Sequence, residues 1–240
     1  MSTMGLRATP VSIAAFAMAA RVLIEGAPAL APDWQGMLLI LAVLSIALGN
    51  VVALAQTNIK RMLAYSTISH VGFVFLGLLS GSAQGASAAM FYVIVYALTA
   101  VGSFGILTIL GREGFDAENL EDLKGLSDRD PWYAAMMALL MFSMAGVPPT
   151  VGFMSKLLVL ESVVRADMIW LAVFAVFFSI IGAFYYLRVV KYIYFDQPAR
   201  VEPIVTGAGV RAAMTVNGLA ILLLGIFPAA LLGLCQTAVR

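Results

Sequence analysis

Residues 131–165 read PWYAAMMALLMFSMAGVPPTVGFMSKLLVLESVVR, a mostly apolar stretch with two adjacent prolines near its middle. The stretch is too long for one straight membrane crossing, which needs about 20 residues. Its interruption, Gly146-Val147-Pro148-Pro149, contains no polar residue that would form a loop. Because proline removes a backbone donor and clashes with the preceding turn, we predict one membrane helix broken at Gly146–Pro149, with Lys156 about two turns beyond the break.

The whole chain has the composition of a membrane protein. Of its 240 residues, 62% are hydrophobic and 11% are charged, with a mean hydropathy of +0.98. A soluble domain has about 45–50% apolar and about 25% charged residues. The net charge of +1 gives neither the basic footprint of a nucleic-acid-binding protein nor a polybasic lipid anchor.

Apolar stretches of membrane-spanning length recur along the sequence. Met62–Leu110 has no charged residue, and because it is too long for one crossing, Ser80–Gly85 is predicted to be a turn between two helices. The other predicted spans are Ala8–Ile24, Gly36–Ala55, Met168–Leu187 and Ala212–Val239. With the broken helix the count is seven, so the sequence predicts an all-α, polytopic membrane bundle. We expect a single membrane domain over residues 1–240, with no soluble domain.

Two segments have more than one interpretation. The first apolar stretch also resembles a secretory signal peptide, with Arg7 before it and Ala29-Leu30-Ala31 as a cleavage site of the A-x-A form, but we expect a membrane helix there. Two polar connections separate the spans, Gly111–Asp130 and Asp196–Arg211. Within the first of them, Asn119–Lys124 is compatible with either a short surface helix or a solvated loop.

Lysines and arginines are divided unevenly between the two ends of the predicted bundle. One end has Arg21, Arg165 and Arg240, and Lys156 is left within the membrane. Because cytoplasmic loops carry the excess of basic residues, we expect the other end to be cytoplasmic. This places the N-terminus in the cytoplasm and the C-terminus on the external, periplasmic side. The basic residues at the cytoplasmic end are Arg7, Lys60, Arg61, Arg112, Lys124, Arg129, Arg188, Lys191, Arg200 and Arg211.

Lys156 is the principal candidate for proton transfer. An ammonium at the bilayer centre costs about 2.5–3.5 kcal/mol on insertion scales, so such residues usually face a polar interior or a water path. Loss of water disfavours the charged form, which lets a lysine lose and regain a proton. A broken helix also frees carbonyls and admits water around a buried site. The alternative is that the four-carbon stem of Lys156 carries the amine to the outer interface.

His70 is the second candidate for proton transfer. It ends the polar stripe YSTISH, residues 65–70, in an apolar span, and histidine exchanges protons near neutrality. Its alternative role is a hydrogen bond between helices. The possible polar path comprises Tyr65, Ser66, Ser69, Tyr185 and Tyr186. The last two alternatively belong to an aromatic belt at the membrane interface.

The remaining marked residues have simpler explanations. Lys60 and Arg61 lie at the cytoplasmic boundary, where snorkelling and orientation account for them. Glu161 and Arg165 are four residues apart, in the order that favours a salt bridge on a helix. The glycines are expected to let neighbouring helices pack closely, at positions 72, 77, 102 and 105.

No motif predicts a nucleotide, metal or redox centre in this chain. The sequence has no GxGxxG before a helix, no P-loop and no His/Cys set with metal-ligand spacing. Cys235 is the single cysteine, so it cannot by itself form an internal disulfide, a CxxC pair or an iron–sulfur ligand set. Electron carriers are therefore expected only in partner proteins.

Several strings together resemble a known family, the N subunits of proton-translocating NADH–quinone oxidoreductase, which is respiratory complex I. The likeness runs from about Ile13 to the C-terminus. The strings are Gly49-Asn50, AQTNIKRMLAYSTISH at 55–70, SMAGVPPTVGF at 143–153 leading to Lys156, and YYLRVV at 185–190.

The resemblance implies an activity as well as a fold. Family members usually have fourteen membrane helices and two inverted repeats, each with a broken helix and a protonatable lysine. This chain looks like helices eight to fourteen, the second repeat with flanking helices, and Lys156 matches the lysine of the second broken helix, on the proton-exit side. The implied role is a translocase subunit of the cell inner (plasma) membrane, whose lysine half-channel is coupled to quinone reduction elsewhere in the complex.

The resemblance also implies where the redox chemistry lies. NAD, FMN, iron–sulfur clusters and quinone would belong to partner subunits, with no cofactor in this chain. The partners would be other membrane-arm subunits, including adjacent antiporter-like subunits, within the lipid bilayer.

The sequence departs from the family pattern in two ways. The first repeat is absent, and Ser12 stands where family members have a lysine. A truncated gene, an internal start or a frameshift would explain both, and we do not expect the chain to pump protons alone. Two alternatives to complex I are a subunit of a multisubunit cation/proton antiporter and a non-conducting structural remnant. The TNIKRMLAYSTISH stretch favours complex I.

Overall fold

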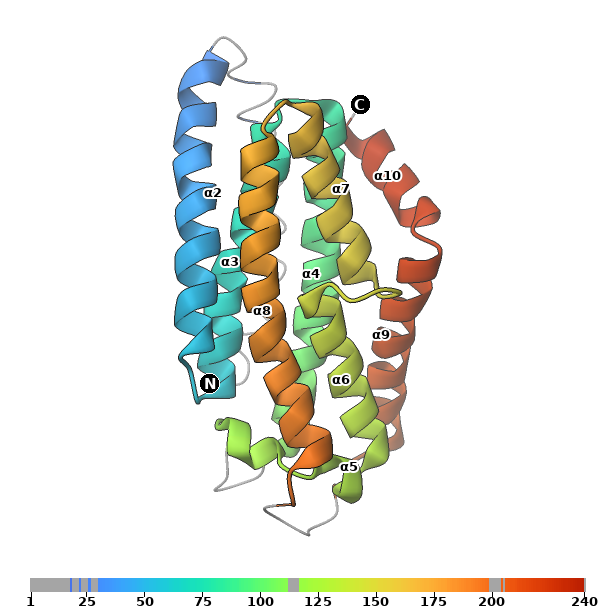
Figure 1. Cartoon of the computed structure of the whole chain (residues 1–240). Coiled ribbons are helices and arrows are strands. Elements are labelled where there is room, and N and C mark those ends of the chain that lie inside the picture. Colours follow the sequence, from blue (N-terminus) through green and yellow to red (C-terminus); the bar gives the residue numbers. More distant parts are fainter. Residues whose placement is uncertain are drawn as a thin grey trace.

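Every regular element described by the computed structural model is helical (Figure 1). The structure describes residues 30–111, 117–198, 204 and 206–239, with the single positions 18, 22 and 26. Apart from positions 18 and 22, the first predicted helix, Ala8–Ile24, lies outside the described residues, and so does Ser12. Within the described residues the helices stack side by side, and the predicted all-α membrane bundle is confirmed (Figure 1).

Helices α2 (Ala31–Leu54), α3 (Ile59–Leu79) and α4 (Ala83–Leu110) run alternately down and up the bundle (Figure 1). The first two pack backbone to backbone. A Cβ placed on Gly49 would lie 2.6 Å from the amide nitrogen of Ser69. The predicted close-packing glycines behave in the same way, since a Cβ at each of positions 72, 77, 102 and 105 would come within 3.0 Å of a neighbouring helix.

The turn predicted between the second and third of these helices is confirmed, although it is shorter than expected. Gly81 has a φ of +62°, which glycine adopts without steric cost. The hydroxyl of Ser82 then accepts a hydrogen bond from the Gly85 amide at 3.0 Å, which caps α4. The helix therefore begins at Ala83, inside the predicted turn.

The polar connection after α4 forms short helices rather than an open loop. A 3-10 helix, η3 (Leu120–Leu123), is followed by the one-turn helix α5 (Leu126–Arg129). The leucines at both ends of η3 are buried, so its helical form follows from packing under the bundle. A salt bridge of 3.1 Å joins Lys60 Nζ to Glu118 Oε1 and fixes this connection to the start of α3.

The predicted helix break is confirmed. Helix α6 (Pro131–Ala145) ends at Gly146, which has a φ of +85°, and α7 (Val151–Arg165) begins after Pro148 and Pro149. Each half contains 15 residues and is therefore about 22 Å long, less than the roughly 30 Å of the hydrocarbon layer. The two halves cross a membrane only as a pair, with the break near mid-depth (Figure 1).

The last two predicted spans differ from the structure. Helix α8 (Ile169–Phe195) continues well beyond the predicted end at Leu187. The predicted span Ala212–Val239 is divided into α9 (Ala208–Ile226) and α10 (Ala229–Val239). The second break falls at Phe227-Pro228, since proline cannot continue the hydrogen-bond ladder of a helix.

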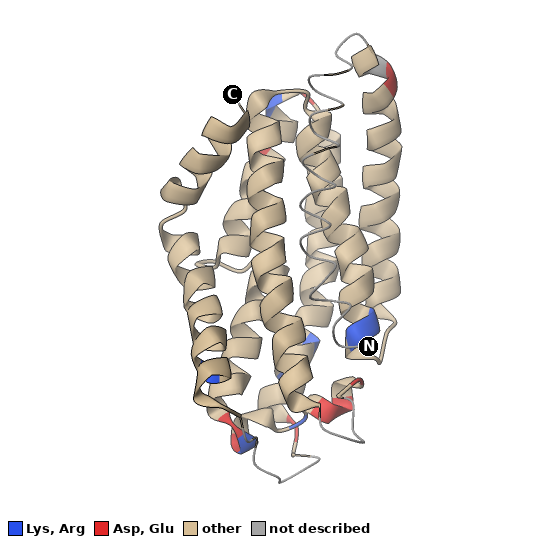
Figure 2. Ribbon diagram, turned by 180° about the vertical axis from the view of Figure 1, so that it is seen from behind, with Lys and Arg blue, Asp and Glu red and all other residues tan. Residues whose placement is uncertain are grey.

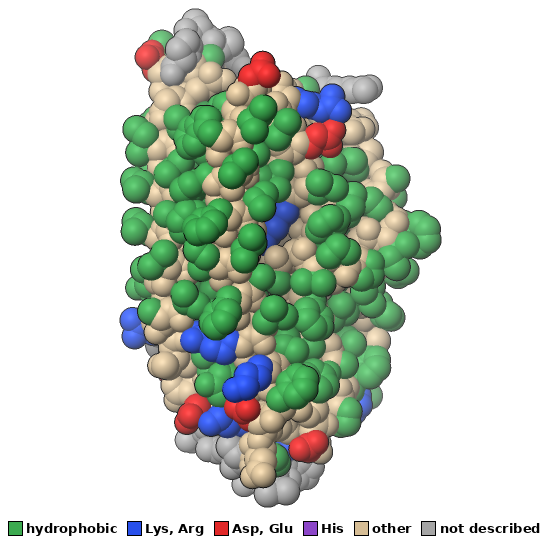
Figure 3. All heavy atoms as spheres, viewed as in Figure 1, with side chains coloured by type: hydrophobic (Ala, Val, Ile, Leu, Met, Phe, Trp, Pro, Cys, Tyr) green, Lys and Arg blue, Asp and Glu red, His purple; other side chains and the backbone are tan. Residues whose placement is uncertain are grey.

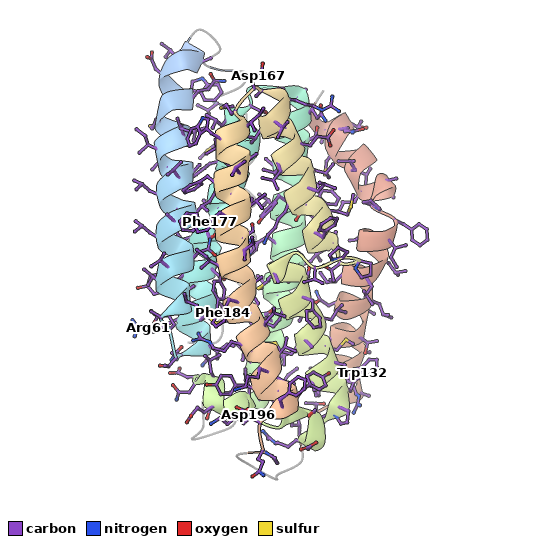
Figure 4. The ribbon with its side chains drawn as sticks, viewed as in Figure 1. Arg61, Trp132, Asp167, Phe177, Phe184 and Asp196 are labelled. Atoms are coloured by element: carbon purple, nitrogen blue, oxygen red, sulfur yellow. The ribbon has the colours of Figure 1, made fainter. Side chains whose placement is uncertain are left out.

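The surface agrees with a membrane environment. Five described helices, α2, α3, α4, α8 and α9, are long and apolar enough to span a membrane. Hydrophobic side chains cover the middle of the face in Figure 3, while charged groups gather toward both ends (Figures 2 and 3). Phe177 and Phe184 project from α8 with exposed fractions of 59% and 64%, and Figure 4 places Asp167 and Asp196 at its opposite ends.

The predicted pair of Glu161 and Arg165 forms a salt bridge of 2.6 Å.

Candidate functional site

The amine of Lys156 lies beside the broken end of α6. Its Nζ donates a hydrogen bond to the Ala145 carbonyl oxygen at 3.0 Å and lies 5.6 Å from the centre of the Phe73 ring. Within the described part of the chain, Lys156 forms no ion pair with a carboxylate. The side chain is half-buried and folds back along the break, where a Cβ on Gly146 would lie 3.0 Å from Lys156 Cδ.

Two opposing effects act on the charge of this amine. The negative end of the α6 dipole and the face of an aromatic ring favour the ammonium form. Removal from water favours the neutral amine. A group held between these effects can change its charge when a neighbouring charge or water molecule moves, which is the property that a proton-transfer site needs.

His70 is the centre of a hydrogen-bonded chain across three helices. Its Nδ1 lies 2.8 Å from the Tyr92 hydroxyl on α4, and its Nε2 lies 2.9 Å from the Tyr186 hydroxyl on α8. A neutral imidazole donates through one nitrogen and accepts through the other, so both ring nitrogens are satisfied without a charge. Exchange between its two tautomers would reverse the direction of both bonds, and this is how a proton moves along such a chain.

A second chain of hydrogen bonds lies beside the first. The Asn50 side-chain amide donates to the Ser69 hydroxyl at 2.7 Å, and the Tyr185 hydroxyl donates to the Asn50 oxygen at 3.1 Å. The rings of Tyr185 and Tyr186 lie 4.5 Å apart, so the two chains meet on α8. All four of these polar side chains are buried in the bundle, where unsatisfied groups are costly.

Two hollows connect Lys156 with His70. One lies among α3, α4, α6 and α7, and the other lies among α2, α3, α6, α7 and α8. Lys156, His70 and Met144 line both. Tyr96 and Ser155 also line the first hollow, and Asn50 and Tyr185 line the second. Each hollow therefore offers polar partners to a water molecule.

The structure brings together most of the residues singled out in the sequence. Ser69, Tyr185 and Tyr186 join the network of His70, while Ser66 turns its hydroxyl back to the Leu63 carbonyl at 2.8 Å. Tyr65 is partly buried and packs beside the core. The belt interpretation of the two tyrosines is wrong, because both are only 1% exposed and α8 continues beyond them.

The basic pair at the start of α3 lies away from this network. Lys60 is paired with Glu118, and the Asn58 side-chain oxygen caps the helix by accepting a hydrogen bond from the Arg61 amide at 2.9 Å. Figure 4 places Arg61 at the same end of the bundle as Asp196. These residues mark the boundary of the bundle and do not line either hollow around Lys156.

Three members of the site, Asn50, Tyr92 and Tyr96, were not predicted as site residues from the sequence. Tyr92 and Tyr96 are four residues apart in a long uncharged run, a spacing that places both on one helix face. Asn50 is a lone amide in an apolar span, where polar side chains usually bond to another helix. Both signals were present in the sequence.

Comparisons with known proteins identify relatives of this chain. The family described as "NADH:quinone oxidoreductase/Mrp antiporter, TM" matches residues 2–182. A curated relative named "NADH-quinone oxidoreductase subunit N", from Thioalkalivibrio sulfidiphilus, is 57% identical over 231 residues, which are 96% of this chain and 48% of the relative. The chain therefore spans about half the length of the curated relatives it matches.

Solved structures show the same arrangement of helices. A chain of respiratory complex I from Thermus thermophilus with bound NADH gives a TM-score of 0.80 at 29% identity, covering 95% of this chain and 49% of that one. A chain of the Mrp complex from Dietzia sp. DQ12-45-1b gives a TM-score of 0.75 at 22% identity, covering 86% of this chain and 47% of that one. The second likeness concerns the fold alone.

Proposed function

Because this chain belongs to the NADH:quinone oxidoreductase/Mrp antiporter transmembrane family, we propose that it serves in the membrane arm of an NADH–quinone oxidoreductase, where Lys156 and His70 move protons. The proposal is carried by one observation: an amine at the broken end of α6 shares two hollows with a histidine that is hydrogen-bonded on both sides. The chain would supply one half-channel for protons, and another polypeptide would supply the rest of the proton path.

Each residue has a distinct role in this proposal. Lys156 holds and releases the proton, and the Ala145 carbonyl oxygen accepts a hydrogen bond from its ammonium form. His70 passes protons between Tyr92 and Tyr186 by exchanging tautomers. The pair of Asn50 and Ser69 holds Tyr185 beside this chain.

The proposal extends to partners and location. Redox chemistry with NAD, FMN, iron–sulfur clusters and quinone would take place in other subunits of the complex. The protein would lie in the cell inner (plasma) membrane, beside other antiporter-like subunits. The end with Lys60, Arg61, Arg188 and Lys191 would face the cytoplasm, because basic residues favour that side.

Purification of the chain with its neighbours tests this assignment. We expect a complex that oxidises NADH and reduces a quinone, with this chain present in stoichiometric amount. Co-purification with antiporter subunits alone, without NADH oxidation, would overturn the assignment in favour of a cation/proton antiporter. That second candidate is favoured by the description of the matching family, which names the Mrp antiporter beside NADH:quinone oxidoreductase.

Replacement of His70 by alanine is predicted to slow proton translocation more than it reduces assembly. The substitution interrupts the chain of hydrogen bonds and leaves the hydroxyls of Tyr92 and Tyr186 without the histidine, at a cost of about 1–3 kcal/mol per buried group. Proton uptake by sealed vesicles, divided by the amount of assembled complex, measures the effect.

The matched control is Ser87→Ala on α4. It removes a buried hydroxyl that donates to the Ala83 carbonyl oxygen of its own helix at 2.8 Å, and it leaves the His70 chain intact. We expect near-normal translocation in this variant. If His70→Ala instead lowers the amount of complex while the complex that remains translocates normally, His70 has only a packing role.

A further inference from the structure

Helix α9 comes close to the backbone of the broken helix at Gly225. A Cβ placed on this glycine would lie 2.6 Å from the Thr150 carbonyl carbon and 2.6 Å from the Val151 nitrogen, and it would also overlap the Pro149 carbonyl oxygen. All three atoms belong to the backbone where α7 begins. Figure 1 shows the link between α6 and α7 reaching α9.

This contact cannot be relieved by a side-chain rotation. Separations under 3.0 Å do not occur between real Cβ atoms and backbone atoms, so any larger residue at position 225 must displace either α9 or the start of α7. Helix α9 is held in place elsewhere. The Asn217 amide donates to the Leu98 carbonyl on α4 at 3.0 Å, and Gly218 lies against Met136 on α6.

The start of α7 determines the position of the Lys156 amine. Val151 is the first residue of α7, and Lys156 lies five residues later in the same helix. Its amine reaches back across the break to Ala145, the last residue of α6. A displacement of the α7 start relative to α6 therefore changes the 3.0 Å hydrogen bond between Nζ and the Ala145 oxygen.

The second helix break lies immediately after this contact. Helix α9 ends at Ile226, and α10 turns away at Phe227-Pro228 to pack against α4. Phe227 itself is 68% exposed, so the turn is not held by burial of its own ring. The two broken helices thus meet at mid-depth, with Gly225 as the point of contact.

We propose that Gly225 is a positioning residue for Lys156, because its backbone contact with Pro149, Thr150 and Val151 fixes where α7 begins. This inference rests on the proposed function of Lys156. The glycine touches neither the amine nor His70, and it acts only by holding the two halves of the broken helix at one separation.

The test is Gly225→Ala in the intact complex. We expect assembly and NADH oxidation to persist, while protons translocated per NADH fall several-fold and the pH dependence of translocation shifts. A purely structural role for the glycine would lower translocation alike at every pH and would not shift its pH dependence.

Two glycines provide matched controls. Gly233 on α10 has nothing within 4 Å of an added Cβ, and Gly218 on α9 would meet the sulfur of Met136, a flexible side chain that can move. Both alanine variants should translocate protons nearly normally. If Gly225→Ala prevents assembly, Pro228→Ala tests the same contact without adding an overlap. Without this proline α9 can continue as a helix, and its end can then move away from the start of α7.

The possible results separate the two proposals. If Gly225→Ala, or Pro228→Ala in its place, behaves like Gly233→Ala, the positioning role is overturned while the role of Lys156 stands. A Gly225→Ala complex whose translocation falls without any shift in its pH dependence also overturns it. If Lys156→Ala by itself leaves translocation unchanged, the proposed function fails, and with it the inference.

Discussion

Complexes that carry Lys156→Ala are expected to assemble and yet to lose most of their NADH-driven proton translocation. The substitution removes the amine that lines both hollows, and no other described lysine or arginine lines either one. It leaves the Ala145 carbonyl without that donor, at a cost of about 1–3 kcal/mol if no water replaces it. A pH-sensitive dye in sealed vesicles measures translocation, and NADH oxidation measures the redox reaction in the same sample.

Two further variants make this test specific. Lys156→Arg keeps a positive charge and a hydrogen-bond donor but cannot lose its proton, so it should also fail to translocate. Lys191→Ala removes an amine that is 65% exposed and lies near Asp196 at the end of α8, and it should have little effect. Normal translocation by an assembled Lys156→Ala complex would refute the role of the amine.

The second large effect is expected from Gly152→Ala, which should prevent the chain from accumulating in the membrane. A Cβ at this position would lie 2.6 Å from the Ser143 carbonyl carbon and 2.8 Å from its hydroxyl oxygen, and it would overlap the carbonyl oxygen. The Gly152 amide also donates to the Ser143 hydroxyl at 3.2 Å. An alanine therefore forces the two halves of the broken helix apart at their crossing. The amount of chain in washed membranes, detected with a terminal tag, measures the loss.

Gly36→Ala is the matched control for this substitution. Gly36 lies in α2 with nothing within 4 Å of an added Cβ, and alanine favours a helix more than glycine does. The control should accumulate at least as well as the unmodified chain. Equal amounts of Gly152→Ala and Gly36→Ala would show that the crossing of α6 and α7 tolerates a wider separation than the structure implies.

The sequence predicts the first helix break but not the second, although both contain proline. Pro148 and Pro149 interrupt the apolar stretch 131–165, which has charged residues in its second half. Because this stretch is too long for one straight crossing, a break at the prolines is expected. Phe227-Pro228 lies in a segment whose length suits a single tilted crossing, and length alone does not require a division. The break becomes evident only when α10 is seen packing against α4.

The site was predictable in its residue types but not in its connections. Lys156 and His70 stand out because an ionisable group is costly in a membrane. From the sequence, Tyr185 and Tyr186 fit either a polar path or an interfacial belt, because the predicted span ends at Leu187. Arg188 in fact reaches the Gln56 carbonyl at 2.8 Å, so the helix continues beyond it with this charge partly satisfied. A hydrogen bond between His70 and Tyr186 joins residues 116 apart, and no local spacing specifies such a contact.

The most direct measurement of the central claim is the reaction of a cysteine at position 156 with a membrane-impermeant maleimide. Lys156→Cys would be placed in a chain with Cys235→Ala, which leaves a single thiol, and compared with Lys191→Cys at the exposed end of α8 in the same background. We predict that the thiol at position 156 reacts far more slowly than the thiol at position 191 with reagent on both sides of the membrane. Equal rates would place the side chain in bulk water and contradict a proton-exchanging amine held at membrane depth by the broken helix.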